Sequence, residues 1–129
     1  MKRDMDLVRN LLLKLEDMPV RPGGVVLLDP AELVLQIDGA TQEEIQYHLR
    51  LMREARFIDN GGTNPLIGIS FRALTWEGHD FLDSVRDPDV WAKTKSGAMA
   101  AGGFTMDLLK EIAKGFIKKQ LEDRTGIKL

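Results

Sequence analysis

The central stretch TQEEIQYHLRLMREARFIDNGGTNPLIGISFRALT constrains the fold of this chain more than any other part of the sequence. Its first half has apolar residues at helical spacing, and Thr41 with Glu44 three positions later forms the capping box of a helix N-terminus. The segment DNGGTNP that follows consists of turn-forming residues. After this turn, Ile67, Ile69 and Phe71 alternate with other residues, as in a strand with one buried face. The stretch therefore predicts a helix followed by two strands that a turn connects.

The order of helix, strand, turn and strand is that of the second half of a winged helix, in which this helix would be the recognition helix. A further helix over residues 4–17 precedes it, because leucines and a valine recur there with a helical period. We therefore predict a mainly helical α+β fold. Residues 1–87 would form a winged-helix domain, which is a helix-turn-helix with a small β wing, and residues 88–129 would add C-terminal helices.

The segment DPAELVLQI between the two helices can be interpreted in two ways. Asp29 as an N-cap, with Pro30 at the first helical position, would begin the short second helix of a helix-turn-helix. Alternatively, Leu33, Leu35 and Ile37 alternate with other residues, as in a short strand paired with the wing. The strand is favoured, because VVLL and LVLQI are rich in residues that suit strands.

The last part of the chain, residues 88–129, predicts a helical extension that packs on the first domain or on a partner subunit. Its final helix, about Thr105 to Leu121, follows KSGAMAAGG, which is interpreted as a loose connection. An amphipathic helix needs a partner, since each large apolar side chain left exposed forgoes about 1.5–3 kcal/mol. Two-fold pairing is the commonest oligomer, and we therefore predict a homodimer. The predicted interface contains Leu109, Ile112 and Phe116.

The residue types present exclude several kinds of site. The chain has no cysteine, which rules out disulfides and thiolate metal sites, and its two histidines are too few for a metal site without carboxylates. His48 lies on the apolar side of its helix and is predicted to be a core residue, and a structural role is also predicted for His79. No phosphate loop or nucleophile motif occurs. We therefore predict a protein that is not an enzyme and that needs no metal or cofactor.

Location and charge limit the partners further. No apolar run approaches the roughly 20 residues of a membrane span, and charges interrupt the first helix, unlike a signal peptide. We expect a cytoplasmic protein with no membrane partner. The net charge is −2, whereas a protein that depends on phosphate contacts usually has a basic excess. The charge disfavours nucleic acid as a partner without excluding it.

The exposed face of the central helix nevertheless has side chains that suit the DNA major groove, because glutamine can pair with adenine and arginine with guanine. On this interpretation the protein is a transcriptional regulator that binds double-stranded DNA through the helix and the wing. The residues predicted to contact DNA are Gln46, Tyr47, Arg50, Arg53, Asn64 and Arg72. Two observations support an alternative: Glu43 and Glu54 lie on the same side, and the wing turn lacks Lys and Arg. In the alternative, the protein is a non-catalytic adaptor that binds another protein.

Four segments spread over nearly the whole chain match the sequence pattern of a known family. They are MKRDMDLVRNLLLKLE, QIDGATQEEIQYHLRLMREARFI, LTWEGHDFLDSVRDPDVWAKTK and GGFTMDLLK. Together they resemble a family of uncharacterised bacterial and prophage proteins, a domain of unknown function (number twenty-five thirteen). The resemblance implies a winged-helix-like fold and frequent location in mobile elements, and it supplies no activity, ligand or catalytic residue. One departure is Arg56, which stands where the family pattern has glycine. The departure implies that the central helix ends without the glycine left-handed cap.

Overall fold

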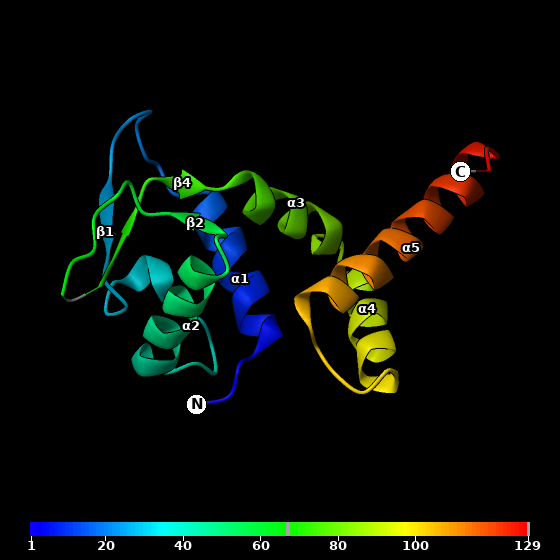
Figure 1. The fold of residues 1–129 in the computed structure, drawn as a ribbon, viewed down its shortest axis with the longest axis horizontal. Coiled ribbons are helices and arrows are strands. Elements are labelled where there is room, and N and C mark those ends of the chain that lie inside the picture. The colour runs from blue at the N-terminus through cyan, green and yellow to red at the C-terminus, as the bar shows by residue number, and fades with distance from the viewer. Residues whose placement is uncertain (67, 129) are drawn as a thin grey trace. The chain divides into compact units, whose positions relative to one another are not determined.

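The computed structural model describes residues 1–66 and 68–128, and it is a mainly helical α+β fold with two small antiparallel sheets (Figure 1). Ile67, which the alternating pattern placed in a strand, lies outside the described residues. The elements in chain order are α1 (Met5–Glu16), β1 (Val26–Leu28), the 3-10 helix η1 (Leu33–Leu35), α2 (Gln42–Glu54), β2 (Ile58–Asp59), β3 (Ile69–Phe71), β4 (Ala73–Leu74), α3 (Trp76–Val85), α4 (Pro88–Ala100) and α5 (Met106–Thr125).

The chain divides into two compact units, residues 1–80 and 81–129. The division falls inside α3, seven residues before the boundary that the sequence predicts after residue 87. The first unit contains the predicted recognition helix and all the strands, and the second contains α4 and α5.

The core of the first unit forms where α1 packs on α2, η1 and β4. Helix α1 begins at Asp4, whose carboxylate accepts hydrogen bonds from the backbone N–H groups of Asp6 and Leu7 at 2.9 and 3.3 Å. The predicted apolar face of this helix is confirmed. Its buried residues are Met5, Leu7, Val8, Leu11, Leu12 and Leu15.

Helix α2 begins with the predicted capping box, which is confirmed in both directions. The N–H of Glu44 donates to the Thr41 hydroxyl at 3.1 Å, and the N–H of Thr41 donates to the Glu44 carboxylate at 3.1 Å. The backbone N–H of Thr41, followed by the Thr41 side chain, stabilises the charged Glu44 carboxylate and holds the pKa of Glu44 below its ordinary value. The face of α2 that is turned to the core carries Ile45, His48, Leu49 and Met52.

His48 occupies the middle of this apolar stripe and is only 1% exposed. Its Nε2 accepts a hydrogen bond from the N–H of Asp4 at 2.8 Å, and Nδ1 lies 2.7 Å from the carbonyl oxygen of Glu44. Nδ1 therefore carries the hydrogen atom and donates a hydrogen bond to that carbonyl, because Nε2 already acts as an acceptor. The predicted core histidine is confirmed. His79, by contrast, is exposed and is not part of the core, and its structural role stays a prediction.

The segment before α2 differs from both interpretations that its sequence allows. Residues 33–35 form a short 3-10 turn, and the strand of this region is β1, two residues before Pro30. The side-chain amide of Gln36 donates to the carbonyl oxygens of Pro30 at 2.6 Å and Glu32 at 3.1 Å, which folds the segment back on itself. Only Leu35 of the three apolar residues in the turn is buried. The predicted strand over LVLQI is wrong, and the predicted helix shrinks to one turn.

The strands form two small sheets rather than one wing sheet. β1 pairs antiparallel with β3, with Leu27 opposite Ser70, and β2 pairs antiparallel with β4, with Ile58 opposite Leu74. Arg72 stands between β3 and β4, and its N–H donates to the carbonyl oxygen of Asp59 at 2.8 Å. The returning chain therefore contacts β1 with its first half and β2 with its second.

Helix α2 ends in a left-handed turn at Arg56, which has φ of 63°. The N–H of Phe57 donates to the carbonyl oxygen of Met52 at 2.9 Å. The N–H of Arg56 donates to the carbonyl oxygen of Arg53 at 3.0 Å. These two bonds are those of a Schellman motif, with both Phe57 and Met52 buried beside it. The expectation that a missing glycine abolishes the left-handed cap is wrong, because the arginine itself adopts the conformation.

In the second unit, α4 and α5 pack against each other. Asp87 caps α4, with Pro88 at the first helical position, an arrangement that an Asp-Pro pair in the sequence favours. Residues 95–100 of the predicted loose connection are helical instead, and they extend α4 to Ala100. Gly97 explains this close packing, since a Cβ built there would lie 3.3 Å from the Ile112 side chain. The connection between the two helices is therefore short, and α4 covers Leu109 and Ala113 of α5 while Ile112 and Phe116 stay half-buried.

Replacing Arg56 with glycine is expected to stabilise the protein by about 0.5–1 kcal/mol, because only a residue without Cβ adopts positive φ at little cost. Urea unfolding followed by circular dichroism measures the change. Ala55→Gly is the matched control, since Ala55 has φ of −73°. Glycine should lower stability there by about 0.5–1 kcal/mol. An equal effect of the two substitutions would contradict the assigned strain.

Replacing His48 with alanine is expected to cost about 2–4 kcal/mol, because it empties a buried site and leaves the Asp4 N–H without its acceptor. The exposed His79 provides the control, and His79→Ala should change stability by less than about 0.5 kcal/mol. Both values come from denaturant unfolding of the intact chain. A His48→Ala loss no larger than that of the control would show that the hydrogen bond from Asp4 to the ring does not hold α1 on α2.

Candidate nucleic-acid interface

The side of α2 that faces away from α1 carries most of the predicted DNA-contacting residues. Arg50 is exposed, whereas Gln46, Tyr47 and Arg53 are half-buried. The Tyr47 ring stands edge-on to the His48 ring, with the centroids 5.6 Å apart and an interplanar angle of 83°. The core histidine thus helps to fix the orientation of the surface tyrosine.

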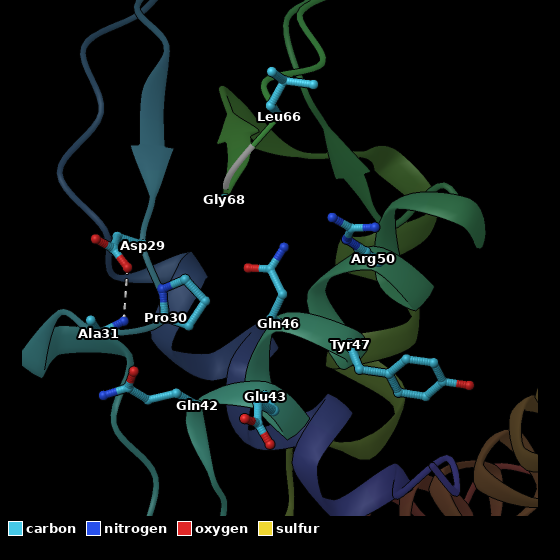
Figure 2. A pocket seen from close by; sticks show the side chains of 10 residues that line it. All are labelled: Asp29, Pro30, Ala31, Gln42, Glu43, Gln46, Tyr47, Arg50, Leu66 and Gly68. Atoms are coloured by element: carbon cyan, nitrogen blue, oxygen red, sulfur yellow. Dashed lines mark hydrogen bonds between the residues drawn. The ribbon is translucent and has the colours of Figure 1, made fainter.

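A first hollow of about 540 Å³ lies beside this face, between α2, the turn that follows β1 and the β2–β3 connection (Figure 2). Gln46 and Arg50 point into it, whereas the Tyr47 ring is directed away. Its described lining residues are Asp29, Pro30, Ala31, Gln42, Glu43, Gln46, Tyr47, Arg50, Leu66 and Gly68. This set mixes two carboxylates with apolar side chains, so the first hollow offers an anion only the single cation Arg50.

A second hollow of about 530 Å³, here called the arginine–asparagine hollow, lies between α2 and the β2–β3 connection. Asn64 holds its polar groups together, because its amide oxygen accepts hydrogen bonds from Asn60 at 3.0 Å and from Arg53 at 3.5 Å. Its described lining residues are Arg50, Arg53, Asn60, Asn64, Pro65, Leu66 and Gly68. None of these residues is acidic, and this hollow is therefore a positively charged site rich in hydrogen-bond donors.

Arg72 lies apart from both hollows and is engaged in an ion pair. Its Nη2 and Nε donate to Oδ2 of Asp59 at 2.6 and 2.9 Å. The N–H of Gly61 donates to the same carboxylate at 2.9 Å. This backbone bond, followed by the Arg72 guanidinium, holds the pKa of Asp59 below its ordinary value. The positive charge of Arg72 is thus balanced locally.

The structure brings together only some of the six residues that the sequence predicts to contact DNA. Gln46, Arg50, Arg53 and Asn64 come together at the two adjoining hollows, whereas Tyr47 lies at an edge and Arg72 lies elsewhere. Asn60 was missed by the sequence analysis, because its position in a glycine-rich turn indicates only a turn. Arg56 was also missed, although the three-residue spacing of Arg50, Arg53 and Arg56 is a visible signal.

The three residues of the predicted oligomer interface have unequal exposure. Leu109 is completely buried within the chain, whereas Ile112 and Phe116 are half-buried. Phe116 lines a shallow hollow with residues of α4, and the Nζ of Lys93 lies 5.9 Å from the centroid of its ring. A partner could therefore contact Ile112 and Phe116 without unfolding the unit, whereas Leu109 is inaccessible.

The described residues show neither a cluster of metal ligands nor a membrane-spanning helix. In residues 1–66 and 68–128, no three His, Asp or Glu side chains are grouped as metal ligands. Both ring nitrogens of His48 are already hydrogen-bonded, so this side chain offers a metal no free lone pair. No helix in the described part of the chain is both long and apolar enough to span a bilayer.

Comparison with known proteins places the chain among uncharacterised relatives. The family model described as "Hypothetical protein (DUF2513)" matches residues 2–104, which include the first unit except Met1 and the whole of α4. An "Uncharacterized protein" of Haemophilus influenzae (strain ATCC 51907 / DSM 11121 / KW20 / Rd) is 32% identical over 124 residues, covering 94% of this chain and 99% of the relative. No solved structure matches the chain. The chain belongs to the domain-of-unknown-function family DUF2513.

Proposed function

We propose that residues 1–80 form a winged helix that binds double-stranded DNA and acts as a cytoplasmic transcriptional regulator. In this proposal α2 is the recognition helix and the β2–β3 connection is the wing. The element order α1, β1, η1, α2, β2, β3 and the antiparallel pairing of β1 with β3 support it. The single turn η1 takes the place of the second helix of a helix-turn-helix.

The arginine–asparagine hollow is the observation that carries the proposal. Arg50 and Arg53 combine two cations with the amide groups of Asn60 and Asn64, and no described residue of the lining is acidic. Arginine pairs with guanine or phosphate, and asparagine or glutamine pairs with adenine. Gln46 lies one helical turn before Arg50 on the same face, so a duplex over this hollow would meet both base-reading and phosphate-binding groups.

Because the first unit as a whole is negatively charged, DNA binding would depend on the local positive charge of this hollow. Residues 1–80 contain nine Lys and Arg against thirteen Asp and Glu, a net charge of −4. Some of the acidic groups are engaged, since Asp59 binds Arg72 and Glu44 caps α2. Affinity would therefore come from the few arginines that face the duplex, and the acidic side of the first hollow would keep DNA away from Asp29 and Glu43.

Affinity for double-stranded DNA is expected to fall steeply with salt, and Arg50→Ala and Arg53→Ala should each weaken binding. Each lost phosphate contact lowers the slope of log K against log salt by about 0.9. Fluorescence anisotropy with pooled bacterial and phage DNA fragments measures both quantities. Arg21→Ala is the control, because Arg21 is an exposed arginine that lines neither hollow. Absence of binding by the wild type at low salt would refute the DNA proposal.

A specific observation favours a second candidate, the non-catalytic adaptor. Leu66 beside the first hollow is 97% exposed, and Leu33 in η1 is 89% exposed. Exposed leucines, one of them lining a partly apolar hollow, suit a protein partner better than a duplex. In this case Leu66→Ser would abolish binding of the partner, whereas Arg50→Ala would have little effect on it.

We also propose a homodimer that forms through the exposed parts of Ile112 and Phe116. Light scattering on the intact protein at tens of micromolar should give about twice the 14.5 kDa mass of the chain. Ile112→Asp combined with Phe116→Asp should give a monomer of unchanged helicity, because a buried carboxylate without a partner is costly. Lys114→Asp on the exposed side of the same helix is the control. A monomeric wild type would contradict the dimer.

A further inference from the structure

Arg56 is kept in a conformation that its side chain makes unfavourable. It is the one non-glycine residue with positive φ in the described parts of the chain, and its φ of 63° is that of a left-handed turn. The two hydrogen bonds of the Schellman motif come from the backbone, so glycine would form them with less strain. Strained residues concentrate at functional sites, where the strain is tolerated for the sake of the side chain.

The Arg56 side chain lies in a third hollow of about 350 Å³, which adjoins the arginine–asparagine hollow. Arg53 and Asn60 line both of these hollows, so the two form one continuous surface. The described residues that line the third hollow are Arg53, Arg56, Ile58, Asp59, Asn60, Thr75 and Glu77. The backbone of Arg56 is anchored as well, since its carbonyl accepts a 2.5 Å hydrogen bond from the Thr75 hydroxyl.

The charges around Arg56 leave its guanidinium available for a ligand. Asp59, one of the two carboxylates in the lining, is engaged by Arg72. Glu77 is the other carboxylate, and no hydrogen bond or ion pair joins it to Arg56 within the described residues. Arg56 is exposed, and it follows Arg50 and Arg53 at the same three-residue spacing. An anion on this surface would therefore meet a row of three cations.

We infer that Arg56 binds a backbone phosphate of the DNA duplex that occupies the arginine–asparagine hollow. The inference rests on the proposed function and adds a contact to it. A phosphate fits better than a base edge, because Arg56 lies beyond the last turn of α2, outside the helix face that would enter the groove. Phosphate contacts position a protein on DNA, whereas base contacts specify the sequence. Arg56 thus fixes how deeply α2 sits in the groove.

Arg56→Gly separates this role from a structural one, because the two predict opposite changes. The variant should melt about 2–4 °C higher than the wild type. It should also bind DNA about tenfold more weakly at low salt, equally for specific and random sequences. Between 50 and 200 mM salt, its affinity should fall about threefold less than that of the wild type, since one phosphate contact is missing. Arg56→Lys keeps the charge and the strain, and it should retain most of the binding.

The possible outcomes separate a failure of the Arg56 inference alone from a failure of the proposed DNA-binding function. If the wild type binds DNA and Arg50→Ala weakens binding, but Arg56→Gly binds with unchanged affinity and salt slope, the inference is overturned and the proposed function stands. A loss of binding confined to one DNA sequence would also overturn it, because that result indicates a base contact. If the wild type does not bind DNA even at low salt, both are overturned.

Discussion

The hydrogen bond from the Asp4 N–H to Nε2 of His48 connects parts of the chain 44 residues apart, and the arrangement of the first unit depends on it. The imidazole lies among leucines and isoleucine, where an unpaired polar group would be costly. Nδ1 is satisfied within α2, whereas Nε2 is satisfied only when α2 is turned so that His48 meets the start of α1. That orientation directs Gln46, Arg50 and Arg53 away from the core.

The left-handed turn at Arg56 provides the second constraint. It reverses the chain directly after α2 and brings β2 and the following loop back beside the helix that they leave. Asn64 thereby reaches Arg53, which it follows by eleven residues, and Asn60 donates a hydrogen bond to the same Asn64 oxygen. The site therefore depends on a strained backbone position, and local stability is lower than glycine would give.

The placement of acidic partners decides which arginines can meet a ligand. Asp59 binds Arg72 and is itself held by the Gly61 N–H, so this pair belongs to the structure of the turn. Arg50 has no such carboxylate in the arginine–asparagine hollow. A chain with a net charge of −2 can therefore present a small positively charged surface, because its negative charges are distributed elsewhere.

Elements whose signals are local could be predicted from the sequence alone. The Thr41–Glu44 box, the Asp87 cap and the apolar stripe of α1 all act over three or four residues, and the structure confirms each of them. The remaining features depend on contacts between distant parts of the chain. The bonds of Gln36 turned residues 33–35 into a 3-10 turn, packing against α5 kept residues 95–100 helical, and Asp59 paired with Arg72 across thirteen residues. Spacing along the chain cannot indicate such partners, because the fold alone brings them within reach.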